Sequence, residues 1–213
     1  MSILITDIRR HGHTKLFDVC SETGVEFIAN EKFLNDNGIL RHTAFDDEDF
    51  ETLKAKAQLI HGIRTAVSVL ELKDRSRKEL LQKLKEKEIP DDVAVMAADY
   101  VRDKGYQDDY RYGLRLAQIS ARSYGKMRTQ EALYHHGIAR ETARQICDEV
   151  YADENACAEQ IDETLEKAAR GIDLHDPAAR NKLFAKLARR GYGSSEISAA
   201  MRRLAEKRKD EQI

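Results

Sequence analysis

Residues 184–204 read FAKLARRGYGSSEISAAMRRL, which is two candidate helices joined by a tight corner. The first helical stretch ends at Arg189 and Arg190, Gly191 follows, and Ser194 precedes the second stretch. Glycine suits the left-handed position after a helix, and serine suits the position that caps the next one. This chemistry fits a DNA-reading helix-turn-helix and equally a general joint between helices. Whether the corner is unique in the chain decides between the two interpretations.

The corner occurs two more times. In each copy a leucine precedes an apolar residue by five positions: Leu84 and Ile89, Leu133 and Ile138, Leu187 and Tyr192. The three leucines are 49 and 54 residues apart. A basic residue lies seven positions before each leucine and an apolar residue seventeen after it: Arg77, Lys126 and Arg180, then Val101, Val150 and Leu204. This recurrence predicts stacked helical units that cannot close a core alone, and it makes a unique recognition helix the less favoured interpretation.

Composition agrees with a helical protein. The 213 residues are 41% hydrophobic and 35% charged, with only 2 prolines and no tryptophan. No apolar run approaches the ~18 residues that span a bilayer, and the first residues, MSILITDIRRHGH, lack the apolar core of a secretory signal. The three cysteines are widely spaced, which fits a reducing compartment. We therefore expect a cytoplasmic protein without membrane contact.

Apolar residues in the N-terminal part of the chain do not follow the helical spacing seen later. Residues 3–10, 15–20 and 25–29 are short apolar runs separated by glycine-containing loops, a pattern typical of a β-meander. From Asp46 the period becomes helical, with acidic residues first and then Phe50, Leu53, Ala57 and Ile60 on one face.

Helix start and stop signals recur down the rest of the chain. Ser76 and Glu79 form a capping-box pattern, and Pro90 and Pro177 stand where a first helical turn accepts proline. Gly105 ends one helix. The next begins at Asp108 or Asp109, with Tyr112, Leu116 and Ile119 along one face. Extra residues at 169–176 are expected to form a loop.

We therefore predict a mainly α protein, with tandem three-helix modules in an elongated curved array after a small β-meander. The expected domains are a strand region over residues 1–45 and helical repeats over 46–107, 108–153 and 154–213. Each repeat contains about three helices.

The sequence offers no set of residues typical of catalysis. His11 and His13 flank Gly12 in a predicted hairpin loop without further metal ligands nearby, and the adjacent pair His135 and His136 points to different sides of a helix. Residues 46–49 are acidic and could hold Mg²⁺, but acids at a helix start are the commoner explanation. No glycine loop cradles a phosphate and no cysteine has a local histidine. We expect no enzyme, no catalytic residue, no metal and no cofactor.

Charge is unevenly distributed, although the net charge is only −2. Residues 1–60 carry 7 basic and 11 acidic residues, residues 115–145 carry 6 and 2, and residues 178–209 carry 10 and 2. Any single basic residue is as readily a solvated surface group. The clusters together favour an acidic partner or a phosphate backbone.

The same stretches resemble the RecX family of regulators of the RecA recombinase, across nearly the whole chain. Residues 74–120 carry Arg75-Ser76, a Glu-Leu pair, Leu84 with its turn, and a Gly-Tyr-x-x-Asp pattern. Residues 124–138 (YGKMRTQEALYHHGI) and the stretch KLFAKLARRGYGSSEISAAM resemble the second and third modules. Two positions depart from the pattern: Glu88 replaces a turn glycine and Gln107 replaces an aliphatic residue.

The resemblance implies a non-enzymatic regulator that binds RecA, free and in filaments on single-stranded DNA. It implies docking along the filament groove and limitation of filament growth, with effects on homologous recombination, DNA repair, the SOS response and co-protease activity. We expect a monomer that contacts DNA directly only weakly. The residues proposed for partner binding are Arg75, Arg77, Lys126, Arg128, Arg144, Arg189, Arg190, Arg202 and Arg203. The alternative is a direct DNA-binding protein that uses the corner of the third repeat as a helix-turn-helix.

The predicted array can be tested by small-angle X-ray scattering. A compact globule of this length has a radius of gyration of about 17 Å. We expect a clearly larger value, because stacked modules extend along one direction. A measured radius close to that of the globule would contradict the array.

Overall fold

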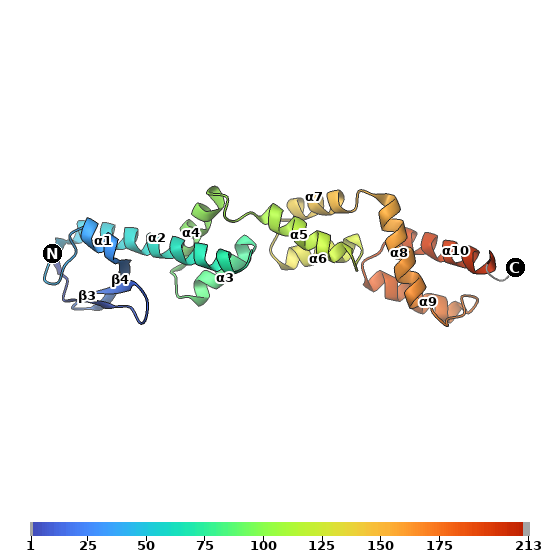
Figure 1. The fold of residues 1–213 in the computed structure, drawn as a ribbon, viewed down its shortest axis with the longest axis horizontal. Coiled ribbons are helices and arrows are strands. Elements are labelled where there is room, and N and C mark those ends of the chain that lie inside the picture. Colours follow the sequence, from blue (N-terminus) through green and yellow to red (C-terminus); the bar gives the residue numbers. More distant parts are fainter. Residues whose placement is uncertain (1, 211–213) are drawn as a thin grey trace. The chain divides into compact units, whose positions relative to one another are not determined.

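The computed structural model describes residues 2–210, which form ten helices and five short strands (Figure 1). The chain divides into two compact units, Met1–Gln107 and Asp108–Ile213. The predicted fold class, mainly helical with a small N-terminal antiparallel sheet, is confirmed.

The first unit begins with two small sheets. Strands β2 (Asp7–Arg10), β3 (Leu16–Ser21) and β4 (Gly24–Asn30) form the expected antiparallel meander. The run 3–10 is not one strand, however, because β1 (Ser2–Leu4) pairs with β5 (Ala44–Asp46) in a separate sheet. The switch occurs where Ile5 exchanges backbone hydrogen bonds with residues 42 and 43, while the Thr6 N–H donates to the Cys20 carbonyl. Strand β5 and the short helix α1 (Glu31–Asp36) were not predicted.

Helix α2 (Asp47–Leu72) joins this sheet region to the first helical group. Asp46 caps the helix by accepting a hydrogen bond from the Asp49 N–H at 2.9 Å, so these acids mark a helix start. Near its beginning, Lys54 Nζ lies 2.8 Å from Glu26 Oε2 on β4. The hydrogen bond from Lys54, with those from the two hydroxyls of residues 21 and 23, lowers the pKa of the Glu26 carboxyl to about 2. The two ends of α2 serve different cores, with Phe50 and Ala57 buried against the sheet and Ala66 and Val69 buried further along.

Helices α3 (Arg77–Glu86) and α4 (Asp91–Asp103) pack on the second half of α2. The predicted cap at Ser76 is confirmed, since its side chain accepts from the Glu79 N–H at 3.2 Å. The core of this group contains Leu80, Leu84, Ile89, Val93, Ala97 and Val101.

The second unit contains six helices within residues 108–210. They are α5 (Asp109–Ala121), α6 (Lys126–His135), α7 (Arg140–Val150), α8 (Glu154–Ala168), α9 (Pro177–Arg189) and α10 (Ser194–Asp210). They bury two separate apolar clusters, one in α5–α7 and one in α8–α10. Each group of three helices therefore has its own core, and the expectation that a unit cannot close a core alone is wrong. The loop expected at residues 169–176 separates α8 from α9. None of the helices within residues 2–210 is both long and apolar enough to cross a bilayer.

The three corners share one backbone geometry. Leu84, Leu133 and Leu187 are each fully buried. In each copy the N–H five residues later donates to the leucine carbonyl, at 3.1 Å from Ile89, 3.0 Å from Ile138 and 3.4 Å from Tyr192. The residues before these donors have left-handed backbones: Glu88 at φ 59°, Gly137 at 84° and Gly191 at 85°.

Two residues that the helical period placed on apolar faces are exposed. Ile119 is 64% exposed and Ile60 is 39% exposed. Helix α5 buries Gly113 and Ala117 instead, because the absence of a side chain at Gly113 lets Ile146 pack against the helix backbone. A Cβ atom at position 113 would lie 2.8 Å from Ile146 Cδ1.

Replacing each anchor leucine by alanine tests the equivalence of the corners. We expect Leu84→Ala, Leu133→Ala and Leu187→Ala each to reduce the free energy of unfolding by about 2–5 kcal/mol, because each opens a cavity in a small core. Urea denaturation measures the change, and Leu72→Ala, whose side chain is 85% exposed, serves as the control. Near-neutral results at two of the three anchors would contradict the alignment.

Candidate partner-binding site

Three of the nine basic residues proposed for partner binding form ion pairs within their own unit. Arg77 Nη2 lies 3.0 Å from Asp99 Oδ1, and Lys126 Nζ lies 2.7 Å from Asp148 Oδ1. Arg203 makes a bidentate contact from α10 to Asp162 on α8, at 2.7 and 2.8 Å. A planar guanidinium held by both carboxylate oxygens is fixed in orientation. These three side chains therefore help to join helices as well as to carry surface charge.

A second group lies where α6 meets the corner between α9 and α10. Arg128 Nη1 donates to the carbonyl of Arg189 at 3.0 Å, and its guanidinium carbon lies 4.3 Å from the centre of the Tyr124 ring. The backbone N–H groups of Gly125 and Met127 donate to the carbonyls of residues 190 and 191. The first N–H groups of a helix have no partner within the helix. The corner of the third module thus caps the start of α6, and it brings Arg128, Arg189 and Arg190 together.

Two glycines make this close contact possible. A Cβ atom on Gly191 would lie 2.4 Å from the Arg128 backbone nitrogen, and one on Gly125 would lie 2.4 Å from the Gly191 carbonyl oxygen. Both obstacles are backbone atoms, so neither can rotate away. Glycine at 191 was expected for the left-handed turn, but its contact with α6 was not expected from the sequence.

The remaining proposed residues are separate from this group. Arg75 belongs to the first unit and is half-buried, with its Nε buried and without a hydrogen-bond partner. Its carbonyl accepts from Gln107 Nε2 at 3.4 Å, which gives the buried polar residue at 107 a partner. Arg144 is exposed on α7, where it adds to the effect of Lys126, whose hydrogen bond lowers the pKa of Asp148. Arg202 is exposed on α10.

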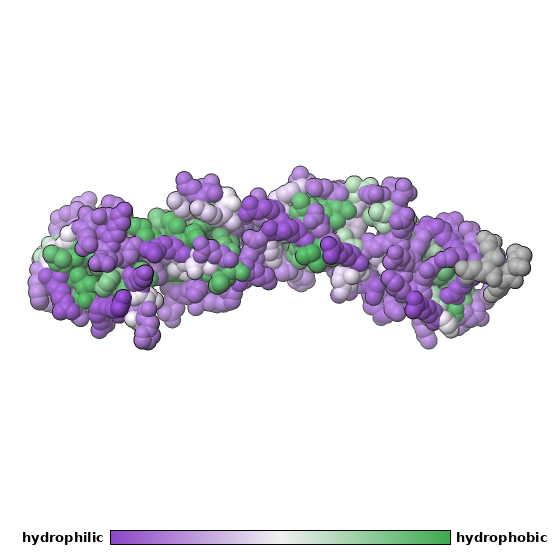
Figure 2. Space-filling view, in the orientation of Figure 1, coloured by the Kyte–Doolittle hydropathy of each residue, from purple (hydrophilic) through white to green (hydrophobic). Residues whose placement is uncertain are grey.

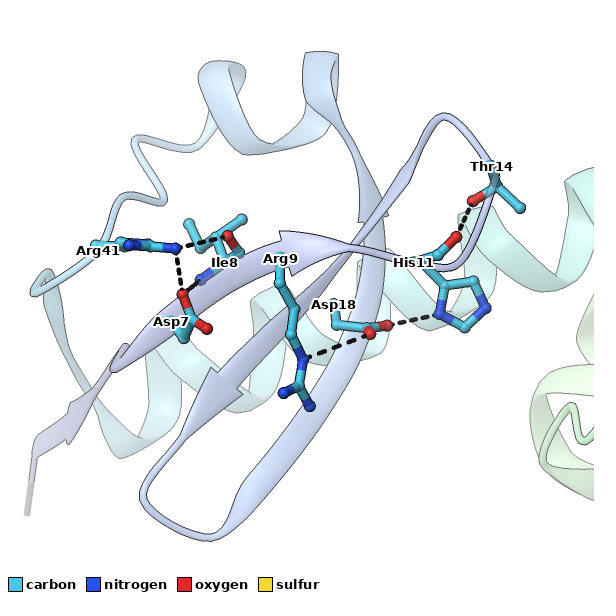
Figure 3. A network of polar contacts seen from close by, with 7 residues as sticks. All are labelled: Asp7, Ile8, Arg9, His11, Thr14, Asp18 and Arg41. Carbon is cyan, nitrogen blue, oxygen red and sulfur yellow. Dashed lines mark hydrogen bonds and ion pairs between the residues drawn. The ribbon is translucent and has the colours of Figure 1, made fainter.

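Acidic residues of the strand region are paired locally (Figure 3). Asp7 Oδ1 lies 2.6 Å from Arg41 Nη2, and Asp18 lies between Arg9 at 3.9 Å and His11 Nδ1 at 2.7 Å. His11 therefore contacts a carboxylate across the β2–β3 hairpin. Within residues 2–210 no group of three or more histidine, cysteine or acidic side chains is arranged to hold a metal ion.

The cysteines are poorly placed for nucleophilic chemistry. Cys20 and Cys147 are buried and Cys157 is half-buried. Burial raises the pKa of the thiols of Cys147 and Cys157, which keeps them protonated at neutral pH. The thiolate is the reactive form, so neither side chain is activated.

Fold and surface together define a class: a tandem repeat protein of three-helix modules that presents arginines on its helices. The family model described as "RecX, first three-helix domain" matches residues 64–100, which are the last third of α2, all of α3 and most of α4. Regulatory protein RecX of Xanthomonas axonopodis pv. citri is 31% identical over 141 residues, 66% of this chain and 85% of the relative. The protein of the same name from Stenotrophomonas maltophilia strain R551-3 is 29% identical, over 74% of this chain and 96% of the relative. The chain therefore belongs to the RecX family of regulatory proteins.

Solved structures show the same fold. A crystal structure of a regulatory protein RecX matches 92% of this chain and 97% of its own with a TM-score of 0.64 and 17% identity. The crystal structure of RecX from Lactobacillus salivarius matches 70% of this chain and 97% of its own, with a TM-score of 0.63 and 21% identity.

Substitutions of the turn glycines distinguish two contributions to stability: the strain of a left-handed backbone and the close contact of Gly191 with α6. We expect Gly191→Ala to reduce the free energy of unfolding by about 2 kcal/mol or more, through both its left-handed backbone and the clash with α6. Gly171→Ala, at φ +69° with no atom near the new Cβ, should show the strain alone. Glu88→Gly should stabilise the protein by about 1 kcal/mol, because it relieves a left-handed glutamate.

Urea denaturation of the three variants provides the measurement. Equal losses for Gly191→Ala and Gly171→Ala would show that the contact between the corner and α6 contributes nothing.

Proposed function

We propose that this protein regulates the RecA recombinase by binding RecA, both free and in filaments on single-stranded DNA, and by limiting filament growth. Recombination and co-protease activity would fall as a consequence. The observation that carries the proposal is the repetition of one corner three times, in a chain that belongs to the RecX family. We propose further that it acts as a cytoplasmic monomer, without cofactor or catalysis.

Repetition gives a physical route to filament binding. A recombinase filament presents the same surface at regular intervals, and a chain of similar modules can offer a matching contact to several of them. Contacts that are weak alone combine through effective concentration once the first is made. Docking along the filament groove would then oppose both the addition of subunits and the movement of DNA strands.

The exposed arginines supply the long-range attraction in this proposal. Arg128, Arg144, Arg189 and Arg202 are exposed on helices of the second unit, while Arg190 is half-buried. Arginine remains charged at any working pH and pairs bidentately with carboxylates and phosphates. Such charges raise the association rate with an acidic protein surface or with DNA. The paired residues Arg77, Lys126 and Arg203 are proposed to contribute less, because carboxylates already lie beside them.

The alternative is a direct DNA-binding protein that uses α10 as a recognition helix. It is disfavoured because the corner at residues 184–204 has the same geometry as two others, and because Arg203 holds α10 to α8. A sequence preference for naked duplex DNA, with steep dependence on salt, would support it.

The central experiment is a filament growth assay with RecA on single-stranded DNA, together with pull-downs against the filament, free RecA and bare DNA. We expect capture by free RecA and by the filament, slower growth, and weak capture by bare DNA. Strong capture by bare DNA with no effect on RecA would contradict the proposal.

A charge reversal tests the exposed arginines. We expect Arg144→Glu combined with Arg189→Glu to lower the association rate with the filament about tenfold and to flatten its dependence on salt. The matched control is Lys32→Glu with Lys56→Glu, which changes the net charge equally at exposed positions of the first unit. Circular dichroism checks the fold, and equal binding by both double variants would show that location of charge is unimportant.

A further inference from the structure

An ion pair that two modules share is absent from the third. Arg77 pairs with Asp99 between α3 and α4, and Lys126 pairs with Asp148 between α6 and α7. Each base lies seven residues before its anchor leucine, and each acid lies fifteen residues after it. Counting from Leu187, the same positions hold Arg180 and Arg202. The third module therefore has a second cation where the other modules have the neutralising carboxylate.

Both arginines line one hollow. It has a volume of about 870 Å³ and lies between α9, α10 and the loop at residues 172–175. Neither Arg180 nor Arg202 has an ion pair or a side-chain hydrogen bond with any residue in the described part of the chain. Helical bundles place ligand sites between facing helices in this way.

The other polar groups of the hollow leave its positive charge largely unopposed. Arg208 donates to the carbonyls of Ala169 and Ile172 at 2.8 and 2.9 Å, so it is fixed by backbone groups. Lys209 and His175 also line the hollow. The single carboxylate among the described lining residues, that of Asp173, accepts a hydrogen bond from the His175 N–H at 2.8 Å.

The floor of the hollow is apolar. Leu174, Phe184 and Met201 line it, and each is half-buried against the core of α8–α10. Hydrophilic side chains cover most of the visible face over these helices, with a small apolar patch among them (Figure 2). A phosphodiester backbone would use the arginines but would leave this floor exposed to water. A peptide with a carboxylate beside an apolar side chain would use both features.

We propose that this hollow binds a short acidic segment of a protein partner. A carboxylate lies between Arg180 and Arg202, and a neighbouring apolar side chain contacts Leu174, Phe184 and Met201. This proposal rests on the proposed function, which supplies the protein partner. It adds the chemistry of the segment that the third module recognises.

The test uses the full chain and a fluorescent hexapeptide of alternating glutamate and phenylalanine, measured by fluorescence anisotropy. Two comparison probes separate the contributions: the same peptide with serine in place of phenylalanine, and a single-stranded oligonucleotide of equal charge. We expect the first peptide to bind, and the serine peptide and the oligonucleotide to bind at least about tenfold more weakly.

The key variant is Arg202→Asp, which gives the third module the carboxylate that the other two possess. It should keep the native circular dichroism spectrum and a melting temperature at least as high as the wild type, while peptide affinity falls at least about tenfold. Arg202→Gln removes the charge without adding a new one and should also weaken binding. Lys186→Asp changes the net charge as Arg202→Asp does, at an exposed position of α9 outside the hollow, and should bind like the wild type.

Three results would overturn the proposal: no binding of the peptide by the wild type, unchanged binding by both Arg202 variants, or tighter binding of the oligonucleotide that Arg202→Asp abolishes. The last result would assign the hollow to nucleic acid. The filament growth assay with RecA tests the proposed function separately. If Arg202→Asp loses the peptide yet limits RecA filaments like the wild type, regulation of RecA stands and the hollow serves another protein.

Discussion

In each of the three corners, one backbone N–H reaches back over a left-handed residue to the carbonyl of a buried leucine. This bond fixes the angle at which the second helix of the pair leaves the first. The angle in turn brings the position seven residues before the leucine opposite the position fifteen residues after it. Which side chains lie next to each other on the surface of a module therefore depends on a hydrogen bond inside that module. Surface residues can differ between modules, as Asp99 and Arg202 do, while the corner stays the same.

The sequence predicted those parts of the fold that depend on neighbouring residues. The caps at Asp46, Ser76 and Asp108 satisfy N–H groups two or three positions away, so their signals are local. The anchor leucines were predicted because the pattern repeats. Strand β5 was missed because its partner β1 lies about forty residues earlier and both are only three residues long. Ile119 was assigned to the apolar face of its helix, because the helical period alone does not show that Gly113 admits a side chain from α7.

The candidate site was less predictable, for an electrostatic reason. Counting charges along the sequence located the basic segments, but it could not show which charges are already opposed. The partner of Arg203 lies 41 residues earlier in the chain, and the partner of Lys126 lies 22 residues later. The backbone contact between Gly125 and Gly191 likewise depends on segments 66 residues apart. Arg202 occupies the position at which the other two modules have an aspartate. The sequence shows this difference only once the spacing of the ion pairs is known.

The four separate apolar clusters have a consequence for synthesis of the chain. Each cluster draws its residues from one continuous segment of about sixty residues or fewer. Low sequence separation between contacting residues favours rapid folding. A segment can then bury its own apolar side chains as it leaves the ribosome, without waiting for the residues that follow. The nascent chain would expose little unfolded apolar surface at any moment, which protects a protein of many small cores from aggregation during translation.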